Sequence, residues 1–189
     1  MLREQALIED CRNGQKQAFG QLVEPLLSKA YRTALGILGS GHLAEDAVQN
    51  ALLEAYTTIM NQKKFTNFNA WFNRLVISRS LDLARKHFKE VNNTYNIEDY
   101  EPSNLNEPPG ILLRNEQFKE FQDMIYTLNV NQRIVLTLYY FQEYTIEEIA
   151  GLLHTNTNTI KTRLSRARKN LQKKFLMGIH NEGGIHNGG

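Results

Sequence analysis

The sequence predicts an all-α protein: two small helical domains joined by a flexible linker, with a helix-turn-helix in the C-terminal domain. Apolar residues recur at helical spacing in both halves of the chain, and the strict alternation typical of strands is rare. Only four prolines occur in 189 residues. A stretch rich in asparagine and proline separates the halves, and residues 93–116 hold one basic and five acidic residues.

Composition narrows the class of protein. Hydrophobic residues make up 41% of the chain, enough for a sizeable core, and the net charge is +2. The single cysteine, Cys11, excludes an internal disulfide and is expected to act as a small apolar residue on a helix face. No apolar run has the roughly 18 residues of a membrane span, and the N-terminus lacks the apolar core of a signal peptide. We therefore expect a cytoplasmic protein without membrane insertion.

Four helices are expected in the first half, over residues 4–13, 16–38, 44–60 and 69–89. Pro25 lies inside the second and should kink or restart it. The third has the clearest apolar face, at spacings of three and four: Ala44, Ala47, Val48, Ala51, Leu52, Ala55, Tyr56 and Ile59. Polar residues off that stripe should face outward: Glu45, Asp46, Gln49, Asn50 and Glu54.

Four further helices are expected in the second half, over residues 112–127, 131–142, 145–153 and 158–175. The last two form the helix-turn-helix. Thr145 and Glu148 have capping-box spacing, and His154, Thr155, Asn156 and Thr157 make a polar turn. Two short amphipathic helices so joined pack at a steep angle, which leaves one face of the second helix free.

That free face has the chemistry of a DNA reader. At about 100° per residue, the apolar stripe of the second helix lies opposite Asn158, Thr162, Ser165 and Lys169. Thr159, Lys161, Arg163, Arg166 and Arg168 flank these residues. Between residues 154 and 176 there are seven basic residues and no acidic one. Small polar groups can read base edges while the cations hold phosphates, so we expect this face to bind DNA.

With these residues in view, the chain resembles the ECF-type sigma factors of the sigma-70 superfamily, over roughly residues 4–175. The stretches 145–153 and 158–171 are similar to the family's C-terminal DNA-binding domain. Ala44 to Gln49 look like the helix that docks on the RNA polymerase clamp. Residues 71–75, followed by Asp82, Arg85 and Lys86, look like the helix that engages the promoter −10 element.

The resemblance implies roles for individual residues. Core RNA polymerase, through its β′ clamp and β subunits, would be bound by Asp46, Gln49, Asn50 and Glu54. The −10 element would be bound by Phe68, Trp71, Arg74, Ser78, Arg79, Arg85 and Lys86, and the 65–70 loop would hold an unstacked base. The −35 element would be read by Asn158, Thr159, Lys161, Thr162, Arg163, Ser165, Arg166, Arg168 and Lys169.

The resemblance also implies an organisation and partners. Residues 1–90 would form the region 2 domain, 91–111 an acidic linker, 112–176 the region 4 domain and 177–189 a disordered Gly-rich tail. Promoter DNA and an anti-sigma factor join core polymerase as implied partners. The family often has an acid where this chain has Asn50, an asparagine where it has Ser78 and a glycine where it has Asn158.

Two other functions stay open on the residues alone: a helix-turn-helix regulator that acts without being a polymerase subunit, and a helical interaction protein that binds no DNA. The outward polar helix at 44–60 and the basic helix at 69–89 disfavour the first, and the acid-free helix at 158–175 disfavours the second. No Gly-rich phosphate loop, metal-ligand cluster or nucleophile elbow is present. We expect no enzyme activity, no cofactor and no metal.

Overall fold

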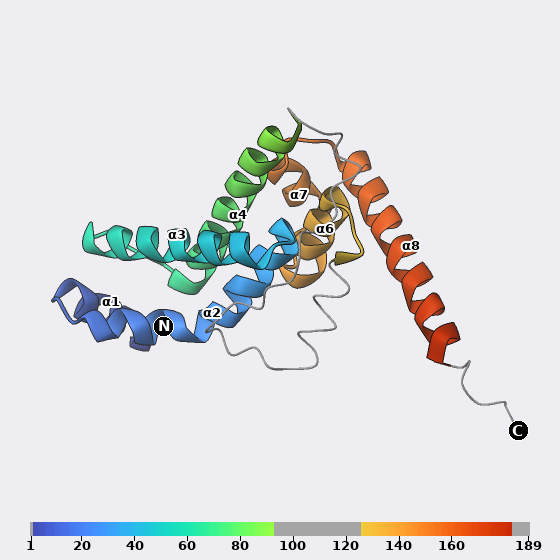
Figure 1. Ribbon diagram of the computed structural model, residues 1–189. Coiled ribbons are helices and arrows are strands. Elements are labelled where there is room, and N and C mark those ends of the chain that lie inside the picture. The colour runs from blue at the N-terminus through green and yellow to red at the C-terminus, as the bar shows by residue number, and fades with distance from the viewer. Residues whose placement is uncertain (1, 93–125, 183–189) are drawn as a thin grey trace, which may run out of the picture. The chain divides into compact units, whose positions relative to one another are not determined.

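A computed structural model describes residues 2–92 and 126–182, and every regular element in these ranges is a helix (Figure 1). The predicted all-α fold is confirmed. Contacts divide the chain into two compact units, Met1–Leu113 and Arg114–Gly189, each of which has its own helices. The acidic linker expected at 91–111 and the helix expected at 112–127 lie almost entirely outside the described residues.

The described part of the first unit consists of four helices: α1 (Leu2–Arg12), α2 (Lys16–Leu38), α3 (Gly41–Met60) and α4 (Phe68–Asn92). Gly39 ends α2 in the left-handed conformation, with φ at +64°, and its N–H donates to the Leu35 carbonyl at 2.7 Å. Ser40 then caps α3 by accepting from the Leu43 N–H. The two glycines and the serine between them therefore set a sharp turn between two long helices.

Pro25 does not restart α2, which runs through it as one helix. Of the two outcomes expected at Pro25, a kink or a new helix, the new helix does not occur. A proline inside a helix leaves the carbonyl four residues earlier, here that of Gln21, without its N–H partner. Both Gln21 and Pro25 are exposed, so solvent can satisfy that carbonyl on the outer side of the helix.

The core of the first unit lies where α2, α3 and α4 pack on one another, with α1 against α2 and α3. The apolar face predicted for α3 is confirmed, because Ala44, Ala47, Val48, Ala51, Ala55 and Ile59 are buried. The alanines give α3 a narrow inner face, and α2 and α4, which pack on α3, bury larger side chains such as Tyr31, Phe72 and Ile77. The outward face of α3 is then left to the polar residues between these positions.

The described part of the second unit comprises α6 (Val130–Leu136), the π-helical turn η2 (Thr137–Phe141), α7 (Ile146–Leu152) and α8 (Thr157–Glu182). Asn129 caps α6 by accepting from the Gln132 N–H at 3.0 Å. One regular helix was expected at 131–142, but its last turn is a π-helix, closed by the Gln142 N–H on the Thr137 carbonyl. The wider turn brings Tyr140 and Phe141 to the surface, 50% and 40% exposed.

The helix-turn-helix is formed by α7 and α8. Thr145 and Glu148 make the expected capping box: the Thr145 hydroxyl accepts from the Glu148 N–H, and the Glu148 carboxylate accepts from the Thr145 N–H at 2.8 Å. His154 enters the turn with φ at +50°, and Asn156 caps α8 by accepting from the Thr159 N–H. Ile149 packs inside, together with Ile160, Leu164 and Ala167 of α8.

α8 is longer than expected. It continues past residue 175 and is helical to Glu182, within the 177–189 stretch for which disorder was predicted. Residues 183–189 lie outside the described part of the chain.

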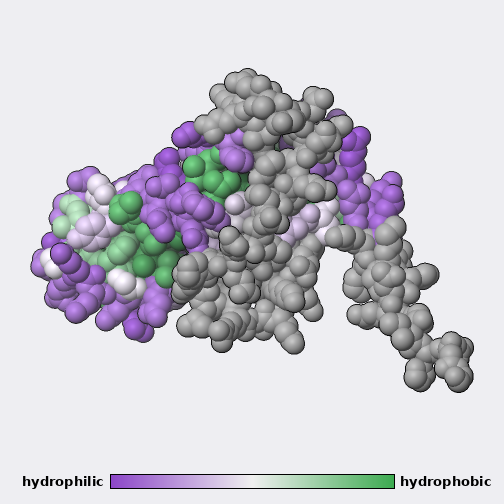
Figure 2. Space-filling view, in the orientation of Figure 1, coloured by the Kyte–Doolittle hydropathy of each residue, from purple (hydrophilic) through white to green (hydrophobic). Residues whose placement is uncertain are grey.

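Among the described helices, none has a stretch long and apolar enough to cross a membrane. Where Figure 2 colours the surface, the visible face is mostly hydrophilic, with a hydrophobic area along α3 and towards α2.

Candidate nucleic-acid interface

The exposed face of α8 carries the residues that the sequence predicts as DNA readers. Ile160, Leu164 and Ala167 are buried, so the opposite side of the helix faces solvent. Seven of the nine predicted residues are exposed, and Thr159 and Arg163 are half-buried at the edges: the exposed ones are Asn158, Lys161, Thr162, Ser165, Arg166, Arg168 and Lys169. Short polar groups thus lie along the middle of a face bordered by cations.

The two threonines of this face already use their hydroxyl protons within the helix. The Thr162 hydroxyl donates to the Asn158 carbonyl at 2.9 Å, and the Thr159 hydroxyl donates to Asn156 Oδ1 at 3.0 Å. A hydroxyl oxygen that donates in this way still has a lone pair. Thr159 and Thr162 therefore face a ligand as acceptors, which matches the exocyclic amino groups of adenine and cytosine in the major groove.

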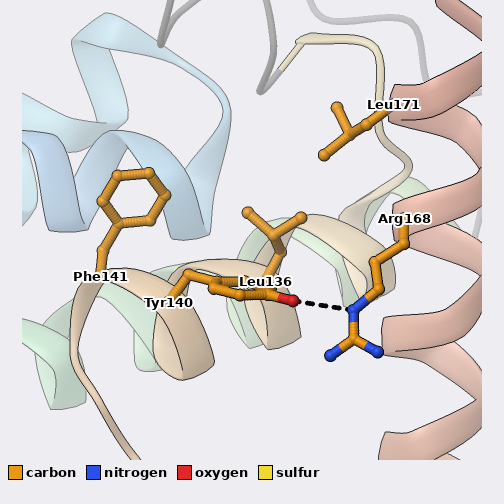
Figure 3. Close-up of a pocket in the computed structure, with 5 residues that line it drawn as sticks. All are labelled: Leu136, Tyr140, Phe141, Arg168 and Leu171. Carbon is orange, nitrogen blue, oxygen red and sulfur yellow. Dashed lines mark hydrogen bonds between the residues drawn. The ribbon is translucent and has the colours of Figure 1, made fainter.

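Arg168 is held by the π-helical turn. Its Nε donates to the Tyr140 hydroxyl at 2.8 Å, and its guanidinium carbon lies 5.7 Å from the centre of the Tyr140 ring. Figure 3 shows this bond at one side of an open groove of about 330 Å³, lined by Leu136, Tyr140, Phe141, Arg168 and Leu171. No pattern in the sequence signals this contact, because the π-helical turn sets the direction of Tyr140.

The outward face of α3 carries the residues predicted to bind polymerase. Gln49, Asn50 and Glu54 are exposed, whereas the Asp46 side chain is 44% exposed and its Oδ2 lies 3.2 Å from His42 Nδ1. Leu53 lies among them and is 68% exposed, more than any other large apolar residue of the described chain. Sequence reasoning missed Leu53, although its place off the apolar stripe, between Asn50 and Glu54, was a usable signal.

Two cations of α4, Arg79 and Arg85, are paired with carboxylates. Arg79 Nε lies 2.8 Å from Glu54 Oε2 of α3, and Arg79 Nη1 lies 3.1 Å from Asp82 Oδ2. Arg85 pairs with the other oxygen of Asp82, also at 3.1 Å. Arg74, Ser78 and Lys86 are exposed on the same helix. The residues predicted to bind phosphates therefore lie at the surface of α4, with the carboxylate of Asp82 among them.

An aromatic cluster lies where α4 begins. The Phe65 ring lies 4.8 Å from the ring of Trp71, and Lys63 Nζ lies 5.2 Å from the Trp71 ring centre. Trp71 is half-buried, so part of its surface stays open. Phe68 is fully buried and stacks on Phe72. The role predicted for Phe68 in holding a base is therefore corrected, because in this structure its ring belongs to the core. Phe65 lies in the 65–70 loop that was predicted to hold a base, whereas Lys63 beside Trp71 was not predicted.

Within the described ranges, no three histidine, cysteine or carboxylate side chains come together as a metal site. Arg79 and Arg85 of α4 form ion pairs with Glu54 and Asp82 at the surface, and Arg168 of α8 donates a hydrogen bond. What the arrangement offers is therefore binding: a polar and basic helix face on α8, a basic row with an aromatic cluster on α4, and a polar face with one exposed leucine on α3.

Comparison with known proteins agrees with both units. A family model described as sigma-70 region 2 matches residues 22–89, and one described as sigma-70, region 4 matches residues 118–171. The ECF RNA polymerase sigma factor SigW of Bacillus subtilis is 28% identical over 176 residues, covering 89% of this chain and 94% of SigW. The RNA polymerase sigma-H factor of Pseudomonas aeruginosa is 25% identical, covering 90% of this chain and 93% of that protein.

Two solved structures share the fold. The sigma factor RpoE of Bartonella quintana, solved in complex with the anti-sigma factor NepR, has a TM-score of 0.55 and 24% identity, and the match covers 82% of this chain and 94% of RpoE. CnrH, solved in complex with the cytosolic domain of CnrY, has a TM-score of 0.51 and 20% identity, with 92% and 97% of the two chains covered.

Proposed function

The chain belongs to the ECF-type sigma factors of the sigma-70 family, which direct RNA polymerase to specific promoters, and from this membership we propose how its surfaces divide that work. The supporting observation is that one chain carries, in order, a region 2 match over α3 and α4 and a region 4 match that reaches into α8. The outward faces of these helices are polar or basic and carry the predicted residues.

The outward face of α3 binds core polymerase. Asp46, Gln49, Asn50 and Glu54 offer acceptors and amides to the clamp of the β′ subunit, and Leu53 adds an apolar contact at the centre of the polar set. Interfaces of this kind draw most of their affinity from a few desolvated side chains inside a polar rim. An exposed leucine among polar residues fits that pattern.

The basic row of α4 binds the −10 element. Arg74, Arg79, Arg85 and Lys86 hold phosphates, while Ser78 faces a base with one hydroxyl. Trp71, with Phe65 and Lys63 beside it, offers an aromatic face and a cation for a base that has left the stack. Phe68 has no direct part in this, since it is buried.

The exposed face of α8 reads the −35 element as duplex DNA. Asn158 and Ser165 have side chains of the right length for base edges, and Lys161, Arg163, Arg166 and Lys169 border them with positive charge. The capped start of α8 points the first turn of the helix to the groove, as in other helix-turn-helix proteins.

The two domains, at residues 1–90 and 112–176 with a linker at 91–111, act together on polymerase. Each offers a small basic surface, so the free protein binds promoter DNA weakly. On polymerase the second contact becomes intramolecular, and its effective concentration rises to the millimolar range for a short linker. Promoter recognition is then a property of the complex.

The remaining partners follow from the same family. Two similar sigma factors were solved with an anti-sigma factor or with the cytosolic domain of a partner protein, and we propose that an anti-sigma factor also covers surfaces of this chain. The protein acts in the cytoplasm, where polymerase and promoters are, as an initiation factor without catalytic activity of its own.

The test is transcription in vitro with purified core polymerase on pooled promoter fragments, with and without the protein. Discrete start sites that need the protein, and that are lost in Asp46→Ala with Gln49→Ala, are the expected result. Glu24→Ala is the matched control, because Glu24 is exposed on α2, a helix that carries none of the proposed contacts. No new start sites, together with tight sequence-specific binding by the protein alone, would point to an ordinary helix-turn-helix regulator instead.

A further inference from the structure

The segment of residues 61–67, between α3 and α4, is held from outside by the first helix of the chain. Arg12 Nη2 donates to the Lys63 carbonyl at 2.8 Å, and Arg12 Nε donates to the Ile59 carbonyl at 3.4 Å. Glu4 Oε1 accepts from the Phe68 N–H at 2.9 Å. Arg12 and Glu4 of α1 therefore form hydrogen bonds with the backbone just before the segment, inside it and just after it.

The charges of the two residues match the helix ends that they contact. The end of α3 presents carbonyls and the start of α4 presents N–H groups, and neither set has partners within its own helix. A cation is favoured at the first position and an anion at the second. Arg12 and Glu4 supply these charges from one helix, about 12 Å apart along its axis at 1.5 Å per residue.

Residues close to the segment in sequence satisfy only some of the backbone groups at these two helix ends. Asn67 caps α4 by accepting from the Ala70 N–H at 2.8 Å, but the N–H of Phe68 is satisfied by Glu4, 64 residues away in sequence. Gln62 is in the left-handed conformation, with φ at +60°, which a side chain other than glycine adopts at some cost. The contact of Arg12 with the next residue's carbonyl helps to hold that turn.

The brace is rigid because α1 is anchored in the core. Ile8 and Cys11 are buried, and the Arg12 side chain is only 16% exposed. The braced segment in turn sets the aromatic cluster, since Lys63 and Phe65 lie against Trp71. The region 2 match begins at residue 22, so this role belongs to a helix that precedes the matched region.

We propose that α1 braces the 61–67 segment for opening of the −10 element, with Glu4 and Arg12 as positioning residues that touch no DNA themselves. The inference rests on the proposed role of the Trp71 cluster at the −10 element. A well-placed cluster lowers the barrier to capturing an unstacked base. A loosened cluster leaves polymerase binding and recognition of the −35 element intact, because the surfaces proposed for these two contacts lie on the outward faces of α3 and α8.

The first test uses the full chain with core polymerase on two templates, a duplex promoter and the same promoter with an unpaired bubble over the −10 element. Glu4→Ala is expected to lower transcription from the duplex roughly tenfold, the effect of losing a strong helix cap, and from the bubble less than about twofold. Glu4→Gln keeps an acceptor oxygen and should restore most of the activity. Gln5→Ala, exposed on the same helix, is the matched control.

A second readout needs no DNA. Trp71 is the chain's only tryptophan, so acrylamide quenching of its fluorescence reports on the cluster. Quenching should rise in Glu4→Ala and in Arg12→Met, and stay at the wild-type level in Glu4→Gln. Thermal unfolding identifies the temperature range in which each variant is folded. Within that range, quenching tests the brace even for a variant that is too unstable for the transcription assay.

The outcomes separate the brace from the sigma factor function. Equal losses on duplex and bubble templates, or Glu4→Ala and Arg12→Met indistinguishable from wild type in both assays, would overturn the brace while leaving the sigma factor function standing. A wild-type protein that supports no transcription from either template would overturn the proposed function itself, and the role in promoter opening with it.

Discussion

Arg79 Nε of α4 lies 2.8 Å from Glu54 Oε2 of α3, so a cation proposed for promoter phosphates is paired with a carboxylate proposed for polymerase. Both side chains are partly exposed, at 37% and 43%. An ion pair of this exposure is worth about 0.2–1 kcal/mol, small enough to exchange partners on binding. The pair joins the two proposed surfaces of the first unit.

Changing Glu54→Gln should therefore act in opposite directions on the two partners. Arg79 loses one of its two carboxylate partners and keeps Asp82, so non-specific duplex binding at low salt should rise about two- to fivefold, as expected for an exposed ion pair. Binding to core polymerase should weaken. Fluorescence anisotropy with labelled duplex and with labelled polymerase measures both. Glu24→Gln removes the same charge from an exposed site on α2; an equal rise in DNA binding there would contradict the specific pairing.

Two substitutions on α8 should separate base reading from phosphate binding. Asn158→Ala should weaken binding to the preferred −35 sequence by about 1–3 kcal/mol and relax the choice of base, with little effect on non-specific DNA. Lys161→Ala should weaken binding to all sequences alike and lower the salt dependence by about one phosphate contact. Titrations of the polymerase complex at several salt concentrations distinguish them, and Lys16→Ala on α2 is the charge-matched control.

Leu53 should be an anchor for polymerase. Because it is 68% exposed, Leu53→Ser removes little buried area in the free protein and should change the free energy of unfolding by less than about 0.5 kcal/mol. Polymerase affinity should nevertheless fall about tenfold, as for a contact residue worth more than about 1 kcal/mol. Leu53→Met keeps an apolar side chain and should bind nearly as wild type. Wild-type affinity in Leu53→Ser would remove the residue from the interface.

Tyr140 should act on DNA only through Arg168. Tyr140→Phe removes the hydroxyl that Arg168 Nε contacts at 2.8 Å and leaves the guanidinium only its contact with the ring. We expect about two- to fivefold weaker −35 binding, at the low end of the net value of a hydrogen bond because both partners are exposed. In a double-mutant cycle, Tyr140→Phe should have no further effect once Arg168 is alanine. Additive losses would show that Tyr140 contacts DNA by another route.

The thiol of Cys11 gives a prediction on pH. Burial, with a smaller contribution from Asp10, raises the pKa of this thiol above its ordinary value of 9.0. The folded state thus keeps its proton more tightly than the unfolded state, so its stabilising contribution is full at neutral pH and falls as pH rises past that value. Urea unfolding at pH 7 and at about pH 10 should show a shallower alkaline loss in Cys11→Ala than in wild type. Equal slopes would contradict this.

The elements were predictable where local patterns decide them. The apolar face of α3, the capping box of Thr145 and Glu148 and the stripe of Ile160, Leu164 and Ala167 all depend on spacing within one helix. The spacing of the apolar residues also predicts which side of α8 is exposed. These features need no knowledge of the rest of the chain.

Features set by distant contacts were not predictable. Phe68 was expected at a base, but it lies on the core side of α4, where it stacks on Phe72. Arg79 finds a carboxylate 25 residues earlier, and Arg168 finds a hydroxyl 28 residues earlier. Helical periodicity gives the face of a residue, but the identity of its partner depends on how separate helices pack.

The surface around Arg168 depends on how many residues the π-helical turn at Thr137–Phe141 holds, as well as on which side chains they carry. A π turn holds one residue more than the α turn that it replaces. Deleting a single residue there would restore regular α geometry and change the directions of the side chains inside the turn, Tyr140 among them. Tyr140 would then leave Arg168, although every residue of α8 stayed unchanged. Insertions and deletions at this turn are thus a way for related chains to differ in how they place a DNA-binding arginine.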